Sequence, residues 1–298
     1  MTKTILITGA SGFTGIHACE YFAKQGYRVF GTVRKMPSVI TENTELIVCD
    51  LANEQDIDKL VHTCKPDYLL HLAGQNHVGT SWEDPVQTLE INAMSTAYLL
   101  QAATKHTPDC KVLIVGSALQ TDPQDISSIP HPYSLSKTLQ TLIALSWTRL
   151  YNMDVMVAKP SNLIGPGNSN GVCAIFIKNI LHAEKSGSIP AINVQNIAAT
   201  RDFVDVRDCI SAYEYIFLKG RPMEVYDITT GGCHSLQTVL EHLQTITGAT
   251  LNITAASNDS SDSFPEIQPK KLLALGWKQK QTLASSLSDM IDYYRSYP

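Results

Sequence analysis

The 298-residue sequence predicts an α/β protein, with a doubly wound parallel sheet and a smaller C-terminal lobe interleaved with it. Two observations predict this fold class. Short apolar runs, most of them rich in Val, Ile or Leu, recur along the first 160 residues, as expected of strands that are buried on both faces. Segments with helical spacing separate these runs, and such alternation is typical of a parallel sheet covered by helices on both sides.

The predicted strands and helices follow one another in order along this first part of the chain. Each apolar run is too short for a free-standing helix, and Asn53 is placed to cap the second helix. Strands are expected at Ile5–Ile7, Arg28–Val33, Leu46–Cys49, Tyr68–Ala73, Val112–Val115 and Val155–Ala158. Helices are expected at Gly15–Gln25, Asn53–Cys64, Pro85–His106 and Pro132–Tyr151.

The pattern changes after Pro160. Gly165–Gly171 (GPGNSNG) is too rich in glycine to continue a regular element. Arg201–Leu218 is expected to form a short extended segment and a helix, Glu224–Thr229 a strand, and Thr282–Tyr294 a final amphipathic helix. We therefore expect a sheet domain of residues 1–160, with 201–229 returning to it, and a lobe formed by 161–200 and 230–298.

Charge and composition exclude several classes of protein. The chain has 23 basic and 28 acidic residues and a net charge of −5, which disfavours binding to nucleic acid or to an anionic membrane. No apolar stretch reaches the ~18 residues that a membrane helix needs, and Met1–Lys3 lead directly into the first strand without a signal sequence. The seven cysteines form no CxxC pair and no zinc-finger spacing with His, so we expect reduced thiols, no metal site and a cytoplasmic protein.

A glycine-rich turn follows the first predicted strand. Gly9, Gly12 and Gly15 have the spacing that permits a tight turn, backbone approach to a pyrophosphate and close packing of the next helix on the strand. The N–H groups at the start of that helix would face the phosphates. The position of this pattern, between a strand and a helix at the N-terminus, predicts that residues 1–160 bind a dinucleotide. The same turn contains Ser11, Phe13 and Thr14.

The end of the second strand indicates which dinucleotide binds. An NAD site has an acidic residue about 20 positions beyond the glycines, where it bonds the ribose hydroxyls. This sequence offers Arg34 instead, and a guanidinium there can pair with the 2′-phosphate of NADP. NADP(H) is therefore favoured, while NAD(H) stays possible because Arg34 can equally belong to a solvated basic turn. Asp50 and Leu51, after the third strand, are placed to meet the adenine, although Asp50 can instead bond only its own loop.

Three polar residues later in the domain form a candidate catalytic group. Tyr133 and Lys137 are four residues apart on a predicted helix, so they share one face. A phenol has a pKa near 10, and a neighbouring ammonium lowers that pKa and can also hold a ribose hydroxyl. Ser117 follows the strand Val112–Val115, at the edge of the sheet where doubly wound folds bind ligands, and its hydroxyl can bond a carbonyl oxygen.

Together these motifs resemble the extended short-chain dehydrogenases/reductases, the NAD-dependent epimerase/dehydratase family, whose members act on nucleotide-activated sugars. The resemblance extends from residue 3 to the C-terminal helix and implies a Rossmann-like fold. It is carried, in family order, by Gly9–Gly15, His71–Gly74, Asn92, Ser117, Tyr133–Lys137, Pro160–Pro166 and Arg201–Val206.

The resemblance also implies roles for individual residues. Tyr133 is expected to be the general acid/base, Lys137 its pKa-lowering partner and Ser117 the hydroxyl that orients the carbonyl. Asn162 and Arg201 are expected to meet the substrate pyrophosphate, although Arg201 can instead pair with a neighbouring aspartate, Asp202 or Asp205. Further cofactor contacts are expected from Leu72, Ala73, Gly74 and Pro160, and further substrate contacts from His77 and Ala118.

The residues after Ser117 narrow the reaction within the family. Dehydratases of the family carry an acidic or polar residue and then Glu at the positions of Ala118 and Leu119, and neither of these two can transfer a proton. Two activities remain: NADPH-dependent reduction of a 4-keto-6-deoxy sugar nucleotide, which is favoured, and 4-epimerisation with bound NAD. Gln75–Val78 and Gly165–Gly171 most resemble the GDP-mannose-type members, so we expect a GDP-sugar first, for example on the way to GDP-D-rhamnose, and CDP-, dTDP- or UDP-sugars after it.

Two further expectations concern partners and exposed side chains. In this family the counterparts of Pro85–His106 and Pro132–Tyr151 form a four-helix bundle, which implies a homodimer; the same helices also cover the sheet. Trp82 can pack near the sugar or anchor the start of a helix, and the second role is favoured. His77 can line the sugar pocket or bond the backbone of its loop. A non-catalytic NADP(H)-sensing protein is disfavoured because the chain keeps Ser117, Tyr133 and Lys137.

Overall fold

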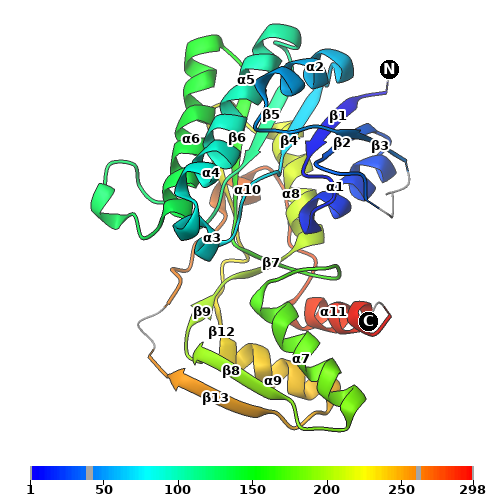
Figure 1. Cartoon of the computed structure of the whole chain (residues 1–298), viewed down its shortest axis with the longest axis vertical. Helices are drawn as coiled ribbons and strands as arrows, with labels where there is room; N and C mark the ends of the chain where they lie inside the picture. The colour runs from blue at the N-terminus through cyan, green and yellow to red at the C-terminus, as the bar shows by residue number, and fades with distance from the viewer. Residues whose placement is uncertain (1, 38–42, 260–262, 297–298) are drawn as a thin grey trace. The chain divides into compact units, whose positions relative to one another are not determined.

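The computed structural model describes residues 2–37, 43–259 and 263–296. The chain divides into two compact units (Figure 1). The first consists of Met1–Lys159 and Ala212–Tyr226, and the second of Pro160–Ser211 and Asp227–Pro298. The chain therefore leaves the first unit, returns to it once and leaves it again.

Within the described residues, a seven-stranded sheet has the strand order β11-β6-β5-β4-β1-β2-β3. β1 pairs in parallel with both β2 and β4, and the order reverses at this point, which is where doubly wound sheets bind ligands. The strands are β1 (Thr4–Thr8), β2 (Arg28–Val33), β3 (Thr44–Val48), β4 (Tyr68–His71), β5 (Lys111–Val115), β6 (Val155–Pro160) and β11 (Val225–Ile228).

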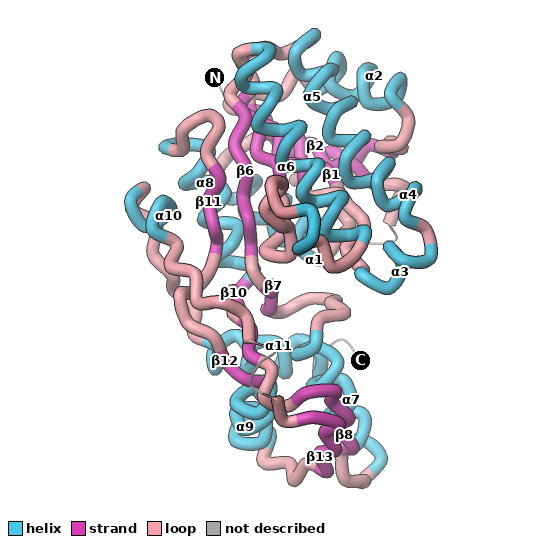
Figure 2. The backbone as a smooth tube through the Cα atoms, turned by 90° about the vertical axis from the view of Figure 1, so that its left-hand side faces the viewer, coloured by secondary structure: helices cyan, strands magenta, loops and turns pink. Residues whose placement is uncertain are grey.

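Helices cover both faces of this sheet in the first unit. α2, α5 and α6 pack side by side on one face, while α1 lies on the other together with the end of α8 (Figures 1 and 2). The contact between α1 and α8 is both polar and apolar. The Tyr21 hydroxyl donates to Glu214 at 2.6 Å, and the rings of Phe22 and Phe217 meet edge to face. The elements are α1 (Phe13–Lys24), α2 (Glu54–Cys64), α3 (Val78–Glu83), α4 (Pro85–Leu89), the π-helical turn η1 (Glu90–Met94), α5 (Ser95–His106), the short 3₁₀ turn η2 (Ile126–Ser128), α6 (Pro132–Tyr151) and α8 (Val206–Lys219).

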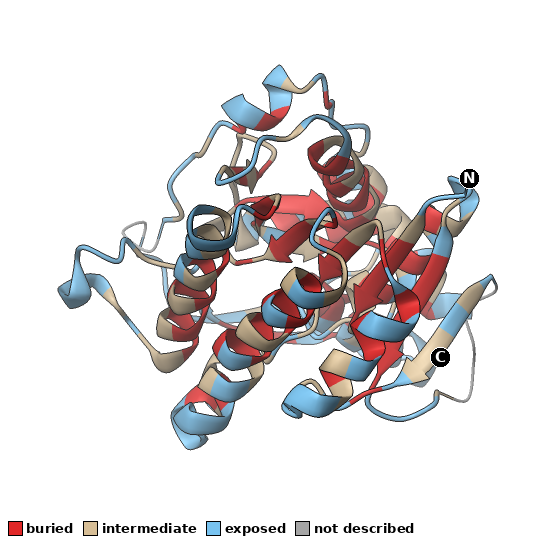
Figure 3. Ribbon diagram, turned by 90° about the horizontal axis from the view of Figure 1, so that it is seen from above, coloured by how far each residue is buried: buried red, intermediate tan, exposed pale blue. Residues whose placement is uncertain are grey.

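The core of the first unit lies between the sheet and its helices. The central strands are buried on both sides, whereas each covering helix turns an exposed side outward (Figure 3). Ile5, Leu6 and Ile7 of β1 are completely buried, which explains why the strand has no polar alternation.

The second unit combines pairs of short strands with helices. Its core joins α7, α9 and α11, with Phe176, Leu240 and Leu287 almost wholly buried. The elements are β7 (Asn162–Ile164), α7 (Val172–Ser186), β8 (Ala191–Asn196), β9 (Thr200–Arg201), β10 (Phe203–Asp205), β12 (His234–Ser235), α9 (Leu236–Thr247), β13 (Asn252–Ser257), α10 (Lys270–Ala274) and α11 (Leu283–Ser296).

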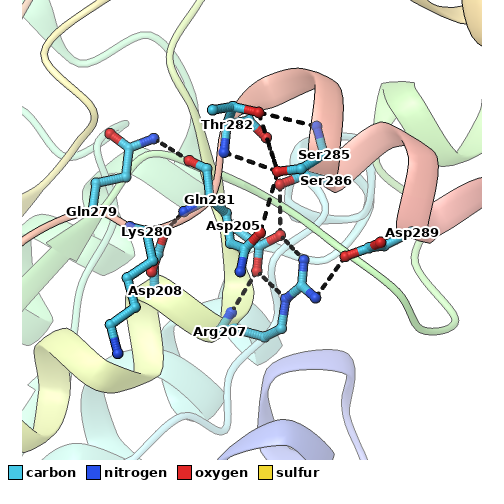
Figure 4. Close-up of polar contacts among 10 residues, drawn as sticks. All are labelled: Asp205, Arg207, Asp208, Gln279, Lys280, Gln281, Thr282, Ser285, Ser286 and Asp289. Atoms are coloured by element: carbon cyan, nitrogen blue, oxygen red, sulfur yellow. Dashed lines mark hydrogen bonds and ion pairs between the residues drawn. The ribbon is translucent and has the colours of Figure 1, made fainter.

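A buried carboxylate ties the C-terminal helix of this unit to β10 (Figure 4). Asp205 is 2% exposed and accepts hydrogen bonds from the backbone N–H and the Nε and Nη2 of Arg207, each at 2.8 Å. The Ser286 hydroxyl of α11 donates to the same carboxylate at 2.6 Å, and Arg207 also pairs with Asp289. Burial alone would raise the pKa of Asp205, but the hydrogen bonds from Arg207 and Ser286 outweigh it and hold the pKa below its usual value.

The predicted fold class is confirmed, and the predicted strands are present with small shifts at their ends. The segments Arg28–Val33 and Pro132–Tyr151 have the predicted bounds, and Pro85–His106 is one helical run interrupted by the π turn. The helices α3, α7 and α9 have no counterpart among the predicted elements. In the part of the chain that the structure describes, no helix is long and apolar enough to cross a membrane. All seven cysteines are free thiols, and every one except Cys233 is buried.

Candidate active site

The glycine turn after β1 has the shape of a phosphate cradle. Gly9 has φ +71°, and a Cβ on it would lie 3.0 Å from Ala73 Cα. A Cβ on Gly15 would lie 2.1 Å from the Gly9 carbonyl oxygen, so only glycine fits there. A Cβ on Gly12 would meet one described atom, the Gly9 carbonyl oxygen at 3.3 Å, and would otherwise occupy open space. That space adjoins the N-terminus of α1, where no side chain among the described residues caps the helix, so the residues fit a dinucleotide pyrophosphate.

The other predicted turn residues lie at the same helix terminus. Gly12 is the N-cap residue of α1, and Phe13 and Thr14 form its first turn. Ser11 is exposed directly before them. Among the described residues, no side chain caps the N–H groups at the start of α1.

A buried histidine, His71, contacts Thr8, the residue directly before the glycine turn. The Thr8 hydroxyl oxygen accepts the N–H groups of Leu72 and Ala73, both at 3.1 Å, so its own proton is directed at His71 Nδ1, 2.8 Å away. His71 is completely buried, and burial together with the charge of Lys137 lowers its pKa to about 3. It is therefore a neutral hydrogen-bonding group that joins the end of β4 to Thr8 of β1.

The residues predicted to meet the adenosine lie after β2 and β3. Arg34 is exposed and directly follows β2, and its neighbours in the sequence, Val33 and Lys35, are not acidic. Asp50 is also exposed, and its Oδ1 accepts the N–H of Ala52 at 3.0 Å, so it does bond its own loop. Leu51 is half-buried and packs on the core of the first unit.

Ser117 and Tyr133 approach each other across the loop that follows β5. A hydrogen bond from Ser117 acts to lower the pKa of Tyr133, but burial raises it more, so the pKa of this phenol is above its usual value. Ser117 Oγ also accepts the N–H of Leu119 at 3.1 Å, which fixes its orientation. The Ser134 hydroxyl donates to the Leu119 carbonyl oxygen at 2.7 Å and holds this loop against α6.

Lys137 lies one turn beyond Tyr133 on α6 and is 5% exposed. Its ammonium donates to the Val115 carbonyl oxygen at 3.0 Å and to Gln140 Oε1 at 2.9 Å. Burial lowers its pKa to about 8. A Cβ on Gly74 would lie 3.5 Å from Lys137 Nζ, so the ammonium faces the backbone of the segment after β4.

Asn92 fixes that segment from the π turn. Its Oδ1 accepts the N–H of Gln75 at 2.8 Å, and its Nδ2 donates to the Gln75 carbonyl oxygen at 3.0 Å. Asn92 Nδ2 also donates to Ser136 Oγ at 2.8 Å, which links the turn to α6. The sequence analysis named Asn92 as part of a motif, but it missed Gln140, although its spacing three residues after Lys137 on one helix was a visible signal.

Three residues that the sequence analysis named for the sugar side of the site are exposed or half-buried. His77 is exposed and caps α3 by accepting the N–H of Thr80 at 3.1 Å, which is the backbone bond that the sequence left open as its alternative. Ala118 is half-buried after Ser117. Trp82 is 64% exposed near the end of α3, so the expectation that it anchors a helix start is wrong.

The remaining predicted residues belong to the second unit. Asn162 Nδ2 donates to the Asp202 carbonyl oxygen at 3.1 Å, and Arg201 Nη1 donates to the Thr200 carbonyl oxygen at 2.7 Å. The Asp202 carboxylate accepts from Ser161 and from the Thr230 backbone and hydroxyl. Pro160 ends β6 and is buried. Among the described residues there is no cluster of three or more His, Cys, Asp or Glu that could hold a metal ion.

Comparison with known proteins places this arrangement in a family. The model of the NAD dependent epimerase/dehydratase family matches residues 5–229. The chain is 28% identical to GDP-6-deoxy-D-mannose reductase of Pseudomonas aeruginosa, over 99% of this chain and 98% of the relative, and 25% identical to the probable UDP-arabinose 4-epimerase 3 of Arabidopsis thaliana, over 99% and 81%. Its fold is similar to that of RMD from Pseudomonas aeruginosa in complex with NADPH, with a TM-score of 0.83, 28% identity and coverage of 99% and 98%. The chain therefore belongs to the NAD-dependent epimerase/dehydratase family.

Proposed function

We propose that the protein uses NADPH to reduce the 4-keto group of a nucleotide-activated 4-keto-6-deoxy hexose, and that the nucleotide is GDP, with GDP-D-rhamnose as an example of the product. One observation carries the proposal: Ser117, Tyr133 and Lys137 stand together, while Ala118 and Leu119 follow Ser117. Keto reduction needs one proton donor, whereas elimination of water needs an acid and a base on the sugar. Ala118 and Leu119 supply neither.

Each residue of the group has a defined task in this reaction. Bound NADPH supplies the hydride that the C4 carbonyl carbon accepts. Tyr133 donates its phenolic proton to the carbonyl oxygen, and the C4 alcohol results. Lys137 stabilises the phenolate that remains on Tyr133, since a charged ammonium favours the ionised phenol. Ser117, held by the N–H of Leu119, directs its hydroxyl at the same carbonyl oxygen.

The cofactor and substrate contacts follow from the positions of the predicted residues. Residues 9–15 would hold the pyrophosphate, Arg34 the 2′-phosphate, Asp50 and Leu51 the adenine, and residues 72–74 with Pro160 the nicotinamide half. The exposed Arg34 favours NADP(H), with NAD(H) as the other possibility, and the similarity to a structure in complex with NADPH supports this preference. On the substrate side, we assign Asn162 and Arg201 to the diphosphate, and His77, Ser117 and Ala118 to the sugar.

A specific observation favours one second candidate, 4-epimerisation of a nucleotide sugar with bound NAD. The same three residues would serve an epimerase, because that reaction also oxidises and reduces C4 through one tyrosine. The chain is 25% identical to a UDP-arabinose 4-epimerase over 99% of its length. We rank it second because the position after β2 carries Arg34 instead of an acidic residue.

The proposal extends to domain roles, assembly and compartment. Residues 1–160 with 201–229 would bind the dinucleotide, and 161–200 with 230–298 the nucleotide sugar. A homodimer through helices 85–106 and 132–151 is supported by their exposed apolar side chains, such as Val86 at 64% and Leu150 at 69%. A cytoplasmic location agrees with the free thiols.

The test is NADPH oxidation, followed at 340 nm, with GDP-, CDP-, dTDP- and UDP-4-keto-6-deoxy sugars generated in place by a dehydratase. The proposal predicts turnover that is fastest with the GDP-sugar and slower with NADH. The matched variant is Tyr133→Phe, which keeps the ring and removes the proton. The proposal would be contradicted if none of these sugars were reduced at the expense of NADPH, or if Tyr133→Phe reduced them as fast as the wild type.

A further inference from the structure

The side chain of Gln140 accepts a hydrogen bond from the ammonium of Lys137. Gln140 is completely buried on α6, and its Oε1 accepts from Lys137 Nζ at 2.9 Å. Its amide Nε2 donates to the Thr96 hydroxyl of α5 at 2.9 Å, and Thr96 in turn donates to the Asn92 carbonyl oxygen at 2.9 Å. If the amide turned by 180°, its NH₂ group would face the Lys137 ammonium and both of these hydrogen bonds would be lost, so the contact with Thr96 holds the amide oxygen toward Lys137.

The contacts of Lys137 leave one of its donors available. An ammonium has three N–H donors. Within the described residues, one goes to the Val115 carbonyl oxygen of β5 and one to Gln140. The third is free to face the segment after β4, because a Cβ on Gly74 would lie 3.5 Å from Nζ. Two fixed acceptors thus define the direction of the third donor.

The acceptor that α6 provides is uncharged. Among the residues described, the titratable groups near the ammonium are Tyr133, one turn away on α6, and the neutral His71 on β4; Val115, Asn92 and Thr96 contribute no charge. A carboxylate at position 140 would pair with the ammonium in a buried environment, where such pairs interact strongly. It would compete with the Tyr133 phenolate for the same positive charge.

We propose that Gln140 is a positioning residue for Lys137. The neutral amide oxygen of Gln140, together with the Val115 carbonyl oxygen of β5, fixes the ammonium and reserves its charge and its third N–H for Tyr133 and the cofactor. The inference rests on the proposed function, since it assumes that Tyr133 and Lys137 act in catalysis. It adds a residue outside the Ser–Tyr–Lys group to the machinery.

The role predicts opposite shifts of a pH profile in two variants. Gln140→Glu adds a carboxylate, so the ammonium keeps its proton to higher pH and the alkaline fall in kcat moves up by at least one pH unit. Gln140→Met removes the acceptor at similar volume, so the fall moves down, and kcat at pH 7 drops by about tenfold through lost orientation. Gln25→Glu, at the exposed end of α1, is the matched control with the same change in charge.

A purely structural role would lower kcat in both variants and leave the pH of the alkaline fall where it is in the wild type, which would overturn the proposal. Equal shifts in Gln25→Glu and Gln140→Glu would overturn it as well. If one variant fails to fold by circular dichroism, the other still decides, because each has its own direction of shift.

A second readout separates this inference from the proposed activity. NADPH binding, measured by its fluorescence between pH 6 and 10, weakens as Lys137 loses its proton and needs no sugar. If the wild type reduces none of the keto sugars, the proposed function fails, but opposite displacements of the binding profile in the two Gln140 variants would still support the role of Gln140. Coincident binding profiles in all four proteins would refute it.

Discussion

Replacing Asp205 by Asn tests the account of the second unit, because it changes one atom of a buried group. Asp205 Oδ1 accepts the N–H and Nε of Arg207, and an amide oxygen can continue to accept both. Oδ2 accepts Arg207 Nη2 at 2.8 Å and the Ser286 hydroxyl at 2.6 Å (Figure 4). In Asp205→Asn, an NH₂ group replaces this oxygen and faces two donors.

The cost follows from these two lost bonds. A hydrogen bond to a charged group contributes about 1.5–3 kcal/mol, so two of them set an upper range of about 3–6 kcal/mol. The Ser286 hydroxyl can rotate to accept from the new amide, and Arg207 keeps its pair with Asp289. We therefore expect Asp205→Asn to lower the free energy of unfolding by about 2–4 kcal/mol.

Asp289→Asn is the matched control, since it removes the same charge from the other partner of Arg207. Asp289 is 42% exposed, and exposed ion pairs contribute about 0–1 kcal/mol. Urea unfolding at pH 7, followed by the fluorescence of tryptophans that include the buried Trp277 of the same unit, measures both variants. Equal losses in the two variants would refute the reasoning.

The pKa of Asp205 gives this prediction a pH dependence. The folded pKa is below the ordinary value of 3.8, so the stabilisation is fully present above that value and is lost as pH falls through the folded pKa. The difference between wild type and Asp205→Asn should therefore be constant from pH 5 to 7 and shrink below pH 4. A difference that grows on acidification would contradict the assignment.

Three further predictions concern the first unit. Gly15→Ala should abolish NADPH binding in a fluorescence titration, because its Cβ would lie 2.1 Å from the Gly9 carbonyl oxygen; binding within threefold of wild type would show that the turn is not the cradle. Arg34→Ala should raise the Kd for NADPH by about tenfold or more and leave that for NADH unchanged, and equal changes for the two cofactors would remove Arg34 from the 2′-phosphate. The kcat of the wild type should fall as pH rises through about 8, because Lys137 loses its proton there and no longer stabilises the Tyr133 phenolate; a constant kcat up to pH 10 would contradict this.

The sequence predicted the sheet domain because its signals are long and local. The strand Arg28–Val33 has no polar alternation, which only burial on both faces explains, and it is buried from Val29 to Val33. The helix Pro132–Tyr151 begins at a proline and continues for 20 residues, so its bounds were readable. The glycine turn was predictable for the same reason, since its spacing is local.

The second unit was less predictable for physical reasons. β7 and β10 have three residues each, which is too short for a period of two to emerge, and they pair with each other across about 40 residues of chain. α7 does carry apolar residues at helical spacing, including Phe176 and Ile180, and this available signal was overlooked next to the glycine-rich loop. The spacing of Gln140 from Lys137 was visible in the sequence, but its contact with Thr96, a residue of another helix, was not.

The central claim is net transfer of hydride from NADPH to the C4 position of a keto sugar. The most direct measurement incubates the protein with its GDP-4-keto-6-deoxy hexose and with NADPH deuterated at C4 of the nicotinamide, on either face in turn, and determines the mass of the sugar nucleotide. The account predicts a product that carries one deuterium at C4 from one of the two labelled cofactors, and none with Tyr133→Phe. Unchanged keto sugar without consumption of NADPH would contradict the reductase, and formation of the unlabelled 4-epimer from a nucleotide sugar with a C4 hydroxyl would identify the epimerase.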